Sequence, residues 1–237
     1  MSSVYLCIPS ARPDGGTIPK WTAAGYKTAI WRDSGAPPIE ANITIIGKYP
    51  GYSKACNALI KMALADQACQ WVVGGGDDVL PDPDHGPEEI AEECEEHFTC
   101  APDLPGTCAK CRTYGVMQPT GDPWRDLQGR IIERIAGSPW IGRAFAERVY
   151  GGNGPWWPDY FHCFGDEELM LVAQRMGVYW QRPDLVHHHE HWARKSGDVK
   201  DMPEFLKEAN SAAHWEKYKA LFMQRKAAGF PGSEVRV

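Results

Sequence analysis

Four short apolar segments constrain the fold of this chain more than any other feature of its sequence. Each has the length of a buried strand and ends at a polar residue or at glycine; they span residues 4–9, 26–31, 43–46 and 71–73. Between the third and the fourth segment, apolar residues recur at helical spacing, at positions 55, 56, 59, 60 and 63. This order of three strands, a helix and a further strand predicts an α/β fold in which helices cover a sheet.

The second half of the chain is less regular. Residues 81–121 are rich in proline, glycine, acidic residues and cysteine, which indicates an insertion or a long loop. Helical patterns return at residues 124–135 and 166–176, and residues 178–186 have the pattern of a strand.

Near the C-terminus, a stripe of apolar residues at helical spacing predicts one packed helix; its members are Phe205, Leu206, Ala209, Ala212, Trp215, Tyr218 and Phe222. We therefore expect one domain over residues 1–202, with a C-terminal helix and tail over residues 203–237 packed on the same domain.

The composition is that of a soluble globular protein. The 237 residues are 43% hydrophobic and 24% charged, and their net charge of -6 gives no general attraction to nucleic acid or to anionic membranes. No apolar run approaches the roughly 20 residues of a membrane span, and the N-terminus lacks the pattern of a signal peptide. We therefore expect a cytoplasmic protein without a membrane partner, whose eight cysteines are mostly reduced or bound to metal.

Two adjacent carboxylates follow the fourth apolar segment, in the stretch WVVGGGDDVLPD. Asp77 and Asp78 would repel each other unless a positive charge lay beside them. Oxygen ligands suit Mn²⁺ or Mg²⁺, and a bound cation would remove the repulsion. The alternative is a turn that simply ends the strand.

A histidine-rich segment, HHHEH, follows the last predicted strand. In an extended segment His187, His189 and His191 share one face, so that one of them can complete the ligand shell of the cation. His189 is our first candidate and His187 the second. The alternative is a cluster of solvent-exposed histidines.

The stretch GDEEL opens a predicted amphipathic helix with carboxylates. Acidic residues are common in a first helical turn because they interact favourably with the helix dipole. Functionally, Asp166 or Glu167 can act as a general base that deprotonates an acceptor hydroxyl.

In this order, the motifs resemble those of the GT-A fold, family-2-type glycosyltransferases. The resemblance rests on PSAR after the first strand, on Arg32 and Asp33 after the second, on the helix GYSKACNALI, on GGGDDVLPD and on GDEEL. Within that family the chain looks like small phage-encoded glycosyltransferases, which would place it in the host cytoplasm. One departure is Gly75, which stands where the family's acidic motif has its first acid.

The resemblance implies roles for individual residues. The nucleotide sugar would contact Pro9, Ser10, Arg12, Asp33, Lys54, Asn57, Gly76 and Asp77, with Asp33 at the base. Asp77 and Asp78, with a histidine from HHHEH, would hold Mn²⁺ or Mg²⁺ on the diphosphate, and Asp166 or Glu167 would be the catalytic base. The transfer would invert the anomeric carbon, as most enzymes of this family do.

The stretch YGGNGPWWPDYF combines glycines with aromatic residues. Glycines permit movement and aromatic faces can stack on a sugar or a base, so Trp156 and Trp157 are candidates for a lid or an acceptor platform. The alternative is an ordinary loop whose tryptophans fill the core.

A second metal site is predicted within an insert at about residues 94–111. His97 and Cys100 are separated by two residues, as are Cys108 and Cys111, which is the ligand spacing of a structural zinc site. Cys94 is an alternative to His97 as the fourth ligand. A zinc ion would hold the shape of a polar segment that cannot do so by burial.

The sequence thus predicts a metal-dependent hexosyltransferase that moves a sugar from a UDP-sugar to a hydroxyl acceptor. The acceptor hypothesis ranked first is a hydroxymethylated base in DNA, hydroxymethylcytosine or hydroxymethyluracil, followed by a protein or a small molecule of a phage. A nucleotidyltransferase is an alternative enzyme class. A zinc-stabilised module that binds nucleic acid or protein without catalysis is the alternative outside enzymes.

Overall fold

The computed structural model describes residues 3–98, 112–122, 136–194 and 202–234. Its described residues form a seven-stranded sheet in the order β3-β2-β1-β4-β6-β5-β7. The strands are β1 (Ser3–Ser10), β2 (Lys27–Arg32), β3 (Ile43–Ile46), β4 (Cys69–Val73), β5 (Val116–Pro119), β6 (Trp140–Gly142) and β7 (Tyr179–Arg182). β1 to β4 are mutually parallel, β6 is antiparallel to β4 and β5, and β7 is parallel to β5. The predicted mixed α/β sheet is confirmed.

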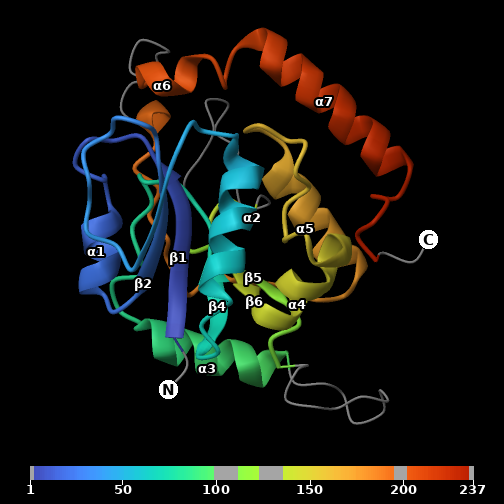
Figure 1. The fold of residues 1–237 in the computed structure, drawn as a ribbon. Coiled ribbons are helices and arrows are strands. Elements are labelled where there is room, and N and C mark those ends of the chain that lie inside the picture. The colour runs from blue at the N-terminus through green and yellow to red at the C-terminus, as the bar shows by residue number, and fades with distance from the viewer. Residues whose placement is uncertain (1–2, 99–111, 123–135, 195–201, 235–237) are drawn as a thin grey trace.

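Helices cover both faces of this sheet (Figure 1). They are α1 (Ile18–Ala23), α2 (Tyr52–Ala63), α3 (Pro87–His97), α4 (Arg143–Arg148), α5 (Gly165–Arg175), α6 (Glu204–Lys207) and α7 (Ala212–Ala227), with two short 3-10 helices, η1 (Val149–Gly152) and η2 (Trp192–Arg194). One hydrophobic cluster packs α2, α4, α5 and α7 on one face, and a second packs α1 and α3 on the other. None of the helices described is long and apolar enough to cross a membrane.

The region from residue 81 to residue 121 contains more regular structure than the sequence indicated. It includes α3, which begins with Pro87 and buries only Ile90, Ala91 and Cys94 beyond that proline, and β5. Helix α3 was missed because glutamates cover most of its surface, so its apolar stripe is narrow. The predicted strand over residues 178–186 is correct only for Tyr179–Arg182, and the predicted helix over residues 124–135 lies outside the described residues.

The predicted single C-terminal helix is divided into two. α6 ends at Lys207, and α7 begins after Ser211, whose side chain caps the helix by accepting a hydrogen bond from the His214 N–H. α7 is attached to the body of the protein by a buried ion pair in which Arg225 Nη2 lies 2.7 Å from Glu168 Oε1. The two helices arch over the end of the sheet at which β1 and β2 terminate (Figure 1).

This topology positions the candidate site. Because β1, β2 and β4 are parallel, their carboxyl ends lie at the same edge of the sheet, and the loops that follow them meet there. Ser10 is the last residue of β1, and the loops contain Arg12, Asp33 and the acid pair.

Candidate active site

A cavity of about 380 Å³ opens at the carboxyl ends of the parallel strands. Its walls come from the loops after β1, β2 and β4, from the start of α5, from residues 189–192 and from the region of α6 and α7. The residues that line it include most of the predicted site, namely Pro9, Ser10, Arg12, Asp33, Gly76, Asp77, Asp78, Asp166, Glu167 and His189.

Asp77 is held by side chains that follow β1. Ser10 Oγ donates a 2.7 Å hydrogen bond to Asp77 Oδ2, and Arg12 Nε donates one of 3.0 Å to Oδ1. The Ser10–Arg12 backbone is in turn fixed by the buried guanidinium of Arg32, which donates to the carbonyl oxygens of Ser10 at 3.1 Å and of Arg12 at 2.7 Å. Burial raises the pKa of Asp77 by more than the contacts with Ser10 and Arg12 lower it.

Asp78 faces a histidine. Its Oδ1 lies 3.2 Å from His189 Nε2, and its Oδ2 lies 3.9 Å from Arg12 Nη2. Burial raises the pKa of Asp78, but the hydrogen bond and charge of His189 and the charge of Arg12 outweigh burial and hold it below its ordinary value. The acid pair and one histidine of HHHEH therefore meet in space.

Backbone pairing brings these distant segments together. Val79 and His189 form an isolated antiparallel bridge, in which the Leu80 N–H donates to the His188 oxygen at 2.9 Å and the Glu190 N–H donates to the Asp78 oxygen at 2.7 Å. Asp122 fixes the same segment, because its Oδ2 accepts the His189 N–H at 3.1 Å.

Close approach of two backbones explains one glycine near the acid pair. Gly16 has a φ of +60°, and a Cβ at this position would lie 2.0 Å from the backbone oxygen of Asp77. That oxygen accepts the Thr17 N–H at 2.9 Å. Glycine is therefore needed where the loop after β1 crosses the loop after β4.

The first turn of α5 places a carboxylate in the wall of the cavity. Burial, with the neighbouring charge of Glu167, raises the pKa of Asp166 to about 6. Burial also raises the pKa of Glu167, and Lys226 opposes that rise. A carboxylate whose pKa approaches neutrality is suited to accept a proton during a reaction.

Two further histidines line the cavity, His162 and His191. Burial lowers the pKa of His162. Burial, with the charge of His189, lowers the pKa of His191 to about 4. The rings of His189 and His191 lie 5.0 Å apart between centroids. His191 is therefore a neutral imidazole near pH 7 beside the acid pair.

His187 does not join His189 in the cavity. It is buried, its Nδ1 lies 3.0 Å from Ser138 Oγ, and Trp140 Nε1 donates to its Nε2 at 3.4 Å. Burial lowers its pKa to about 4. Because both ring nitrogens have partners in the core, His187 supports the sheet instead of reaching the acid pair.

Lys54 and Asn57 also lie away from the cavity. Lys54 is exposed on α2. Asn57 Nδ2 donates to the Trp156 oxygen at 2.7 Å, and Asn57 Oδ1 accepts the Trp156 N–H at 3.2 Å. Asn57 therefore anchors the loop that carries Trp156, and neither residue lines the cavity.

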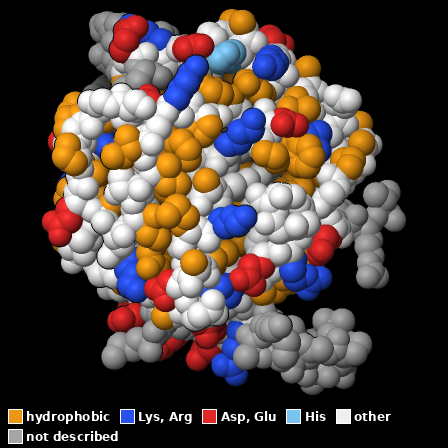
Figure 2. All heavy atoms as spheres, viewed as in Figure 1, with side chains coloured by type: hydrophobic (Ala, Val, Ile, Leu, Met, Phe, Trp, Pro, Cys, Tyr) orange, Lys and Arg blue, Asp and Glu red, His pale blue; other side chains and the backbone are white. Residues whose placement is uncertain are grey.

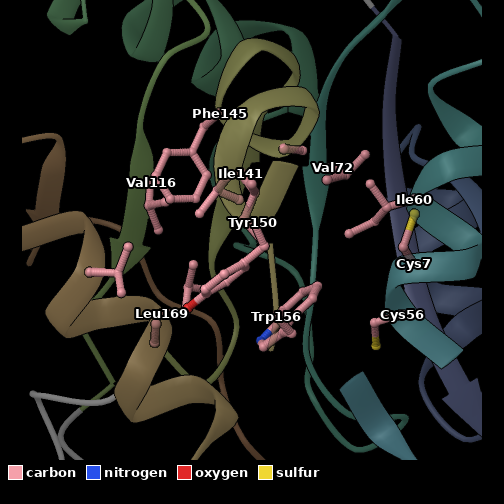
Figure 3. Close-up of a cluster of buried hydrophobic side chains, with 14 of the residues drawn as sticks. Cys7, Cys56, Ile60, Val72, Val116, Ile141, Phe145, Tyr150, Trp156 and Leu169 are labelled. Carbon is pink, nitrogen blue, oxygen red and sulfur yellow. The ribbon is translucent and has the colours of Figure 1, made fainter. Parts of the chain in front are cut away.

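Trp156 is a core residue in this structure, and Trp157 is partly buried and packs against the same core; neither lines the cavity. Trp156 is 1% exposed and lies in the buried cluster with Cys56 and Leu169 (Figure 3). The guanidinium carbon of Arg225 lies 3.6 Å from the ring centroid of Trp157. The aromatic residues that do line the cavity are Trp31, Tyr49, Tyr52, Phe164, Trp192 and Trp215.

The predicted zinc site is only partly covered by the structure. Cys100, Cys108 and Cys111 lie outside the described residues. His97 stacks on Trp180, with ring centroids 3.9 Å apart, and Cys94 is a free thiol buried in the core. Within the described ranges, no group of three or more His, Cys, Asp or Glu residues is arranged to hold a metal. The zinc ion remains a prediction.

Sequence reasoning missed the residues that α6 and α7 contribute to the cavity, namely Leu206, Ala209, Asn210 and Trp215. The apolar spacing of Leu206, Ala209 and Trp215 indicated burial in the core, and Asn210 was not part of that pattern. Tyr52 was missed too, although its hydroxyl accepts the Gly75 N–H at 2.9 Å and so fixes the glycine loop.

No family model matches the sequence, and no curated protein matches it. The fold is similar to that of S. aureus TarS in complex with UDP, with a TM-score of 0.52, 10% identity, and coverage of 95% of this chain and 72% of TarS. At this identity the likeness concerns the fold.

Two further structures are more distant. The Drosophila beta-1,4-galactosyltransferase 7, in complex with manganese, UDP-Gal and xylobiose, has a TM-score of 0.48, 11% identity, and coverage of 89% of this chain and 80% of that one. A glycosyltransferase involved in glycosylation of the major capsid of PBCV-1 has a TM-score of 0.38, 12% identity, and coverage of 91% and 99%. The chain therefore has a mixed α/β fold that is similar to the fold of TarS.

Proposed function

We propose that this protein is a metal-dependent, inverting glycosyltransferase that uses a UDP-sugar. The observation that supports the proposal is the convergence of three groups on one cavity. Asp78 with His189 lies on one side, Arg12 lies beside the acid pair, and Asp166 forms another wall. The cavity opens at the carboxyl ends of parallel strands, where α/β folds bind nucleotides.

The donor set fits a divalent cation shared with a diphosphate. Mg²⁺ and similar cations are commonly held by one or two carboxylates, with phosphate oxygens and water completing the shell. Within the described residues no group of three or more His, Cys, Asp or Glu side chains is arranged to hold a metal. The cation would therefore rest on two protein ligands, Asp78 and His189, whose oxygen and nitrogen lie 3.2 Å apart. Asp77, which is bonded to Ser10 and Arg12, would add negative charge beside it. The bound cation would neutralise charge on the departing diphosphate.

The remaining chemistry is assigned to the chain's own residues. Asp166 accepts the proton of the acceptor hydroxyl, whose oxygen forms a bond to the anomeric carbon as the bond from that carbon to the diphosphate breaks. Pro9, Asp33 and Tyr49 line the cavity at the ends of β1, β2 and β3, where they would surround the nucleoside. One displacement at the anomeric carbon inverts its configuration.

The first test is release of UDP from UDP-glucose, UDP-galactose and UDP-N-acetylglucosamine, measured with Mn²⁺, with Mg²⁺ and with EDTA. We expect at least one donor to be cleaved only with the metal, and cleavage to be lost in Asp78→Asn. The matched control is Asp84→Asn, because Asp84 is an exposed aspartate outside the cavity. Equal cleavage with EDTA would exclude metal dependence, and absence of UDP binding and cleavage for every donor would refute the proposal.

The acceptor is examined with the donor that is cleaved. Oligonucleotides that contain hydroxymethylcytosine or hydroxymethyluracil form one arm, and neutral glycosides form another. Mass analysis of the acceptor identifies a transferred hexose.

A further inference from the structure

One wall of the cavity contains an exposed tryptophan. Trp215 is 45% exposed, although its indole is large and apolar, and it lines the cavity together with Leu206 and Ala209. Large apolar groups at this exposure on a cavity wall are typical of binding surfaces. The sequence assigned Trp215 to the core.

Trp215 has one backbone contact and one ring contact that limit its movement. Its backbone N–H donates to the Ser211 oxygen at 2.9 Å, within the capped first turn of α7. Its ring lies against Phe164, with centroids 4.8 Å apart. Rigid placement reduces the entropy that is lost when a ligand stacks on the ring.

The same contact links Trp215 to the candidate base. Phe164 is the N-cap residue of α5, with a left-handed φ of 72°, and Asp166 follows two positions later in the first turn. Phe164, Asp166 and Trp215 all line the cavity. A ring stacked on Trp215 is therefore placed on the wall that carries the proton acceptor.

The charges on this wall disfavour a phosphate. Asp166 and Glu167 are the ionisable residues that α5 contributes to the cavity, and among the described lining residues the single Lys or Arg is Arg12. Arg12 is paired with the acid pair, 3.0 Å from Asp77. Lys226 acts on Glu167 but does not line the cavity. A nucleic acid would therefore bring its phosphates towards two carboxylates in a part of the cavity that no described Lys or Arg lines.

The outer surface gives no compensating basic path on the face that is visible in Figure 2. There, Lys and Arg side chains are scattered among hydrophobic, neutral and acidic ones and do not merge into a stripe. An acceptor without charge suits these surroundings better than DNA.

We propose that Trp215, with Leu206 and Ala209, forms the acceptor subsite, and that the acceptor is a neutral pyranose ring. One apolar face of the ring stacks on the indole and one hydroxyl points to Asp166. This inference rests on the proposed function, since it assigns the acceptor of the same reaction.

The test compares methyl glycosides of glucose, galactose, mannose and xylose with a hydroxymethylcytosine oligonucleotide, in the wild type and in Trp215→Ala. We expect at least one methyl glycoside to accelerate UDP release and to become glycosylated. In Trp215→Ala its KM rises about tenfold, whereas the KM of the UDP-sugar changes less than twofold. Trp215→Phe, which keeps an aromatic face, recovers part of the loss.

The matched control is Met223→Ala, because Met223 is an exposed apolar residue of the same helix that does not line the cavity. Its kinetics should equal those of the wild type. Transfer to the oligonucleotide and to no glycoside overturns the proposal, as does an unchanged acceptor KM in Trp215→Ala or UDP release that no acceptor accelerates. Absence of metal-dependent UDP release in the wild type refutes the proposed function itself, and the acceptor subsite with it.

Discussion

Two carboxylate clusters, residues 77–78 and residues 166–168, look alike in the sequence but lie in different surroundings. In the first cluster each acid faces a basic side chain: Asp77 contacts Arg12, and Asp78 contacts His189. Burial still raises the pKa of Asp77, whereas the contacts with His189 and Arg12 hold that of Asp78 below its ordinary value. The pKa values of these two adjacent aspartates are therefore shifted in opposite directions.

The second cluster separates its acids more strongly. Glu168 is fully buried and accepts hydrogen bonds from Arg225, from Tyr150 at 2.5 Å and from Tyr160 at 2.8 Å. Asp166 faces the cavity. Its burial and the charge of Glu167 raise its pKa, and backbone N–H groups lower it. The comparison indicates that the groups around a carboxylate, and not its position in a motif, determine which role suits it: metal ligand, proton acceptor or structural anchor.

Asp166→Asn gives the largest expected effect, because it removes the proton acceptor without changing the size of the side chain. Transfer should fall about 10²- to 10⁴-fold, while UDP affinity, measured by calorimetry, changes little. Glu167→Gln is the matched comparison and should lose less than tenfold. If Glu167→Gln loses more than Asp166→Asn, Glu167 is the base and the two roles are exchanged.

Glu168→Gln should reduce stability instead of chemistry. Removing one charge of a buried ion pair leaves Arg225 uncompensated and costs about 3 kcal/mol of the free energy of unfolding. Urea denaturation measures this loss. The double variant Glu168→Gln, Arg225→Met should recover part of it, and Asp166→Asn should not reduce stability by a similar amount. If Glu168→Gln is as stable as the wild type, Glu168 is not a structural anchor, and the proposed difference between Glu168 and Asp166 is wrong.

The activity of the wild type should depend on pH through Asp166. A base acts when it is deprotonated, so the rate of transfer rises with pH through the pKa of about 6 and is level above it. At one pH unit below this value the rate should be about tenfold lower. The residual activity of Asp166→Asn should lack this limb between pH 5 and pH 7. A limb that persists in the variant would assign the titration to another group.

The sequence predicted the parts of the fold that follow from local patterns. The strands that became β1 to β4, helix α2 and the acid pair are recognisable because buried strands and amphipathic helices have regular spacing. Ser10, Arg12 and Asp33 were assigned to the nucleotide pocket only by the resemblance to the family, and in the structure they line the cavity at the carboxyl ends of the parallel strands.

Other features depend on contacts between distant segments, which spacing does not encode. In HHHEH, the alternation of side chains gave no means to distinguish His187, which packs on Trp140, from His189, which meets Asp78. The apolar stripe near the C-terminus gave no sign that Trp215 would be left on a cavity wall. Trp156 was assigned to a lid because glycines surround it, whereas Asn57 ties its backbone to α2.

Arg12→Gln tests the first cluster and has the smallest expected effect. Arg12 lies 3.0 Å from Asp77 and 3.9 Å from Asp78, so its guanidinium competes with a cation for the same carboxylates. An ion pair of this partly exposed kind is worth up to about 1 kcal/mol, and its removal should strengthen Mn²⁺ binding in the absence of nucleotide up to about fivefold. The free Mn²⁺ signal in electron paramagnetic resonance measures the change. UDP affinity in the presence of Mn²⁺ should fall in the same variant, because the diphosphate loses a cationic partner. Weaker Mn²⁺ binding in Arg12→Gln would mean that Arg12 organises the acid pair for the metal instead of competing with it. The basic partners of residues 77–78 would then be structural, like the Arg225 partner of Glu168 in the second cluster.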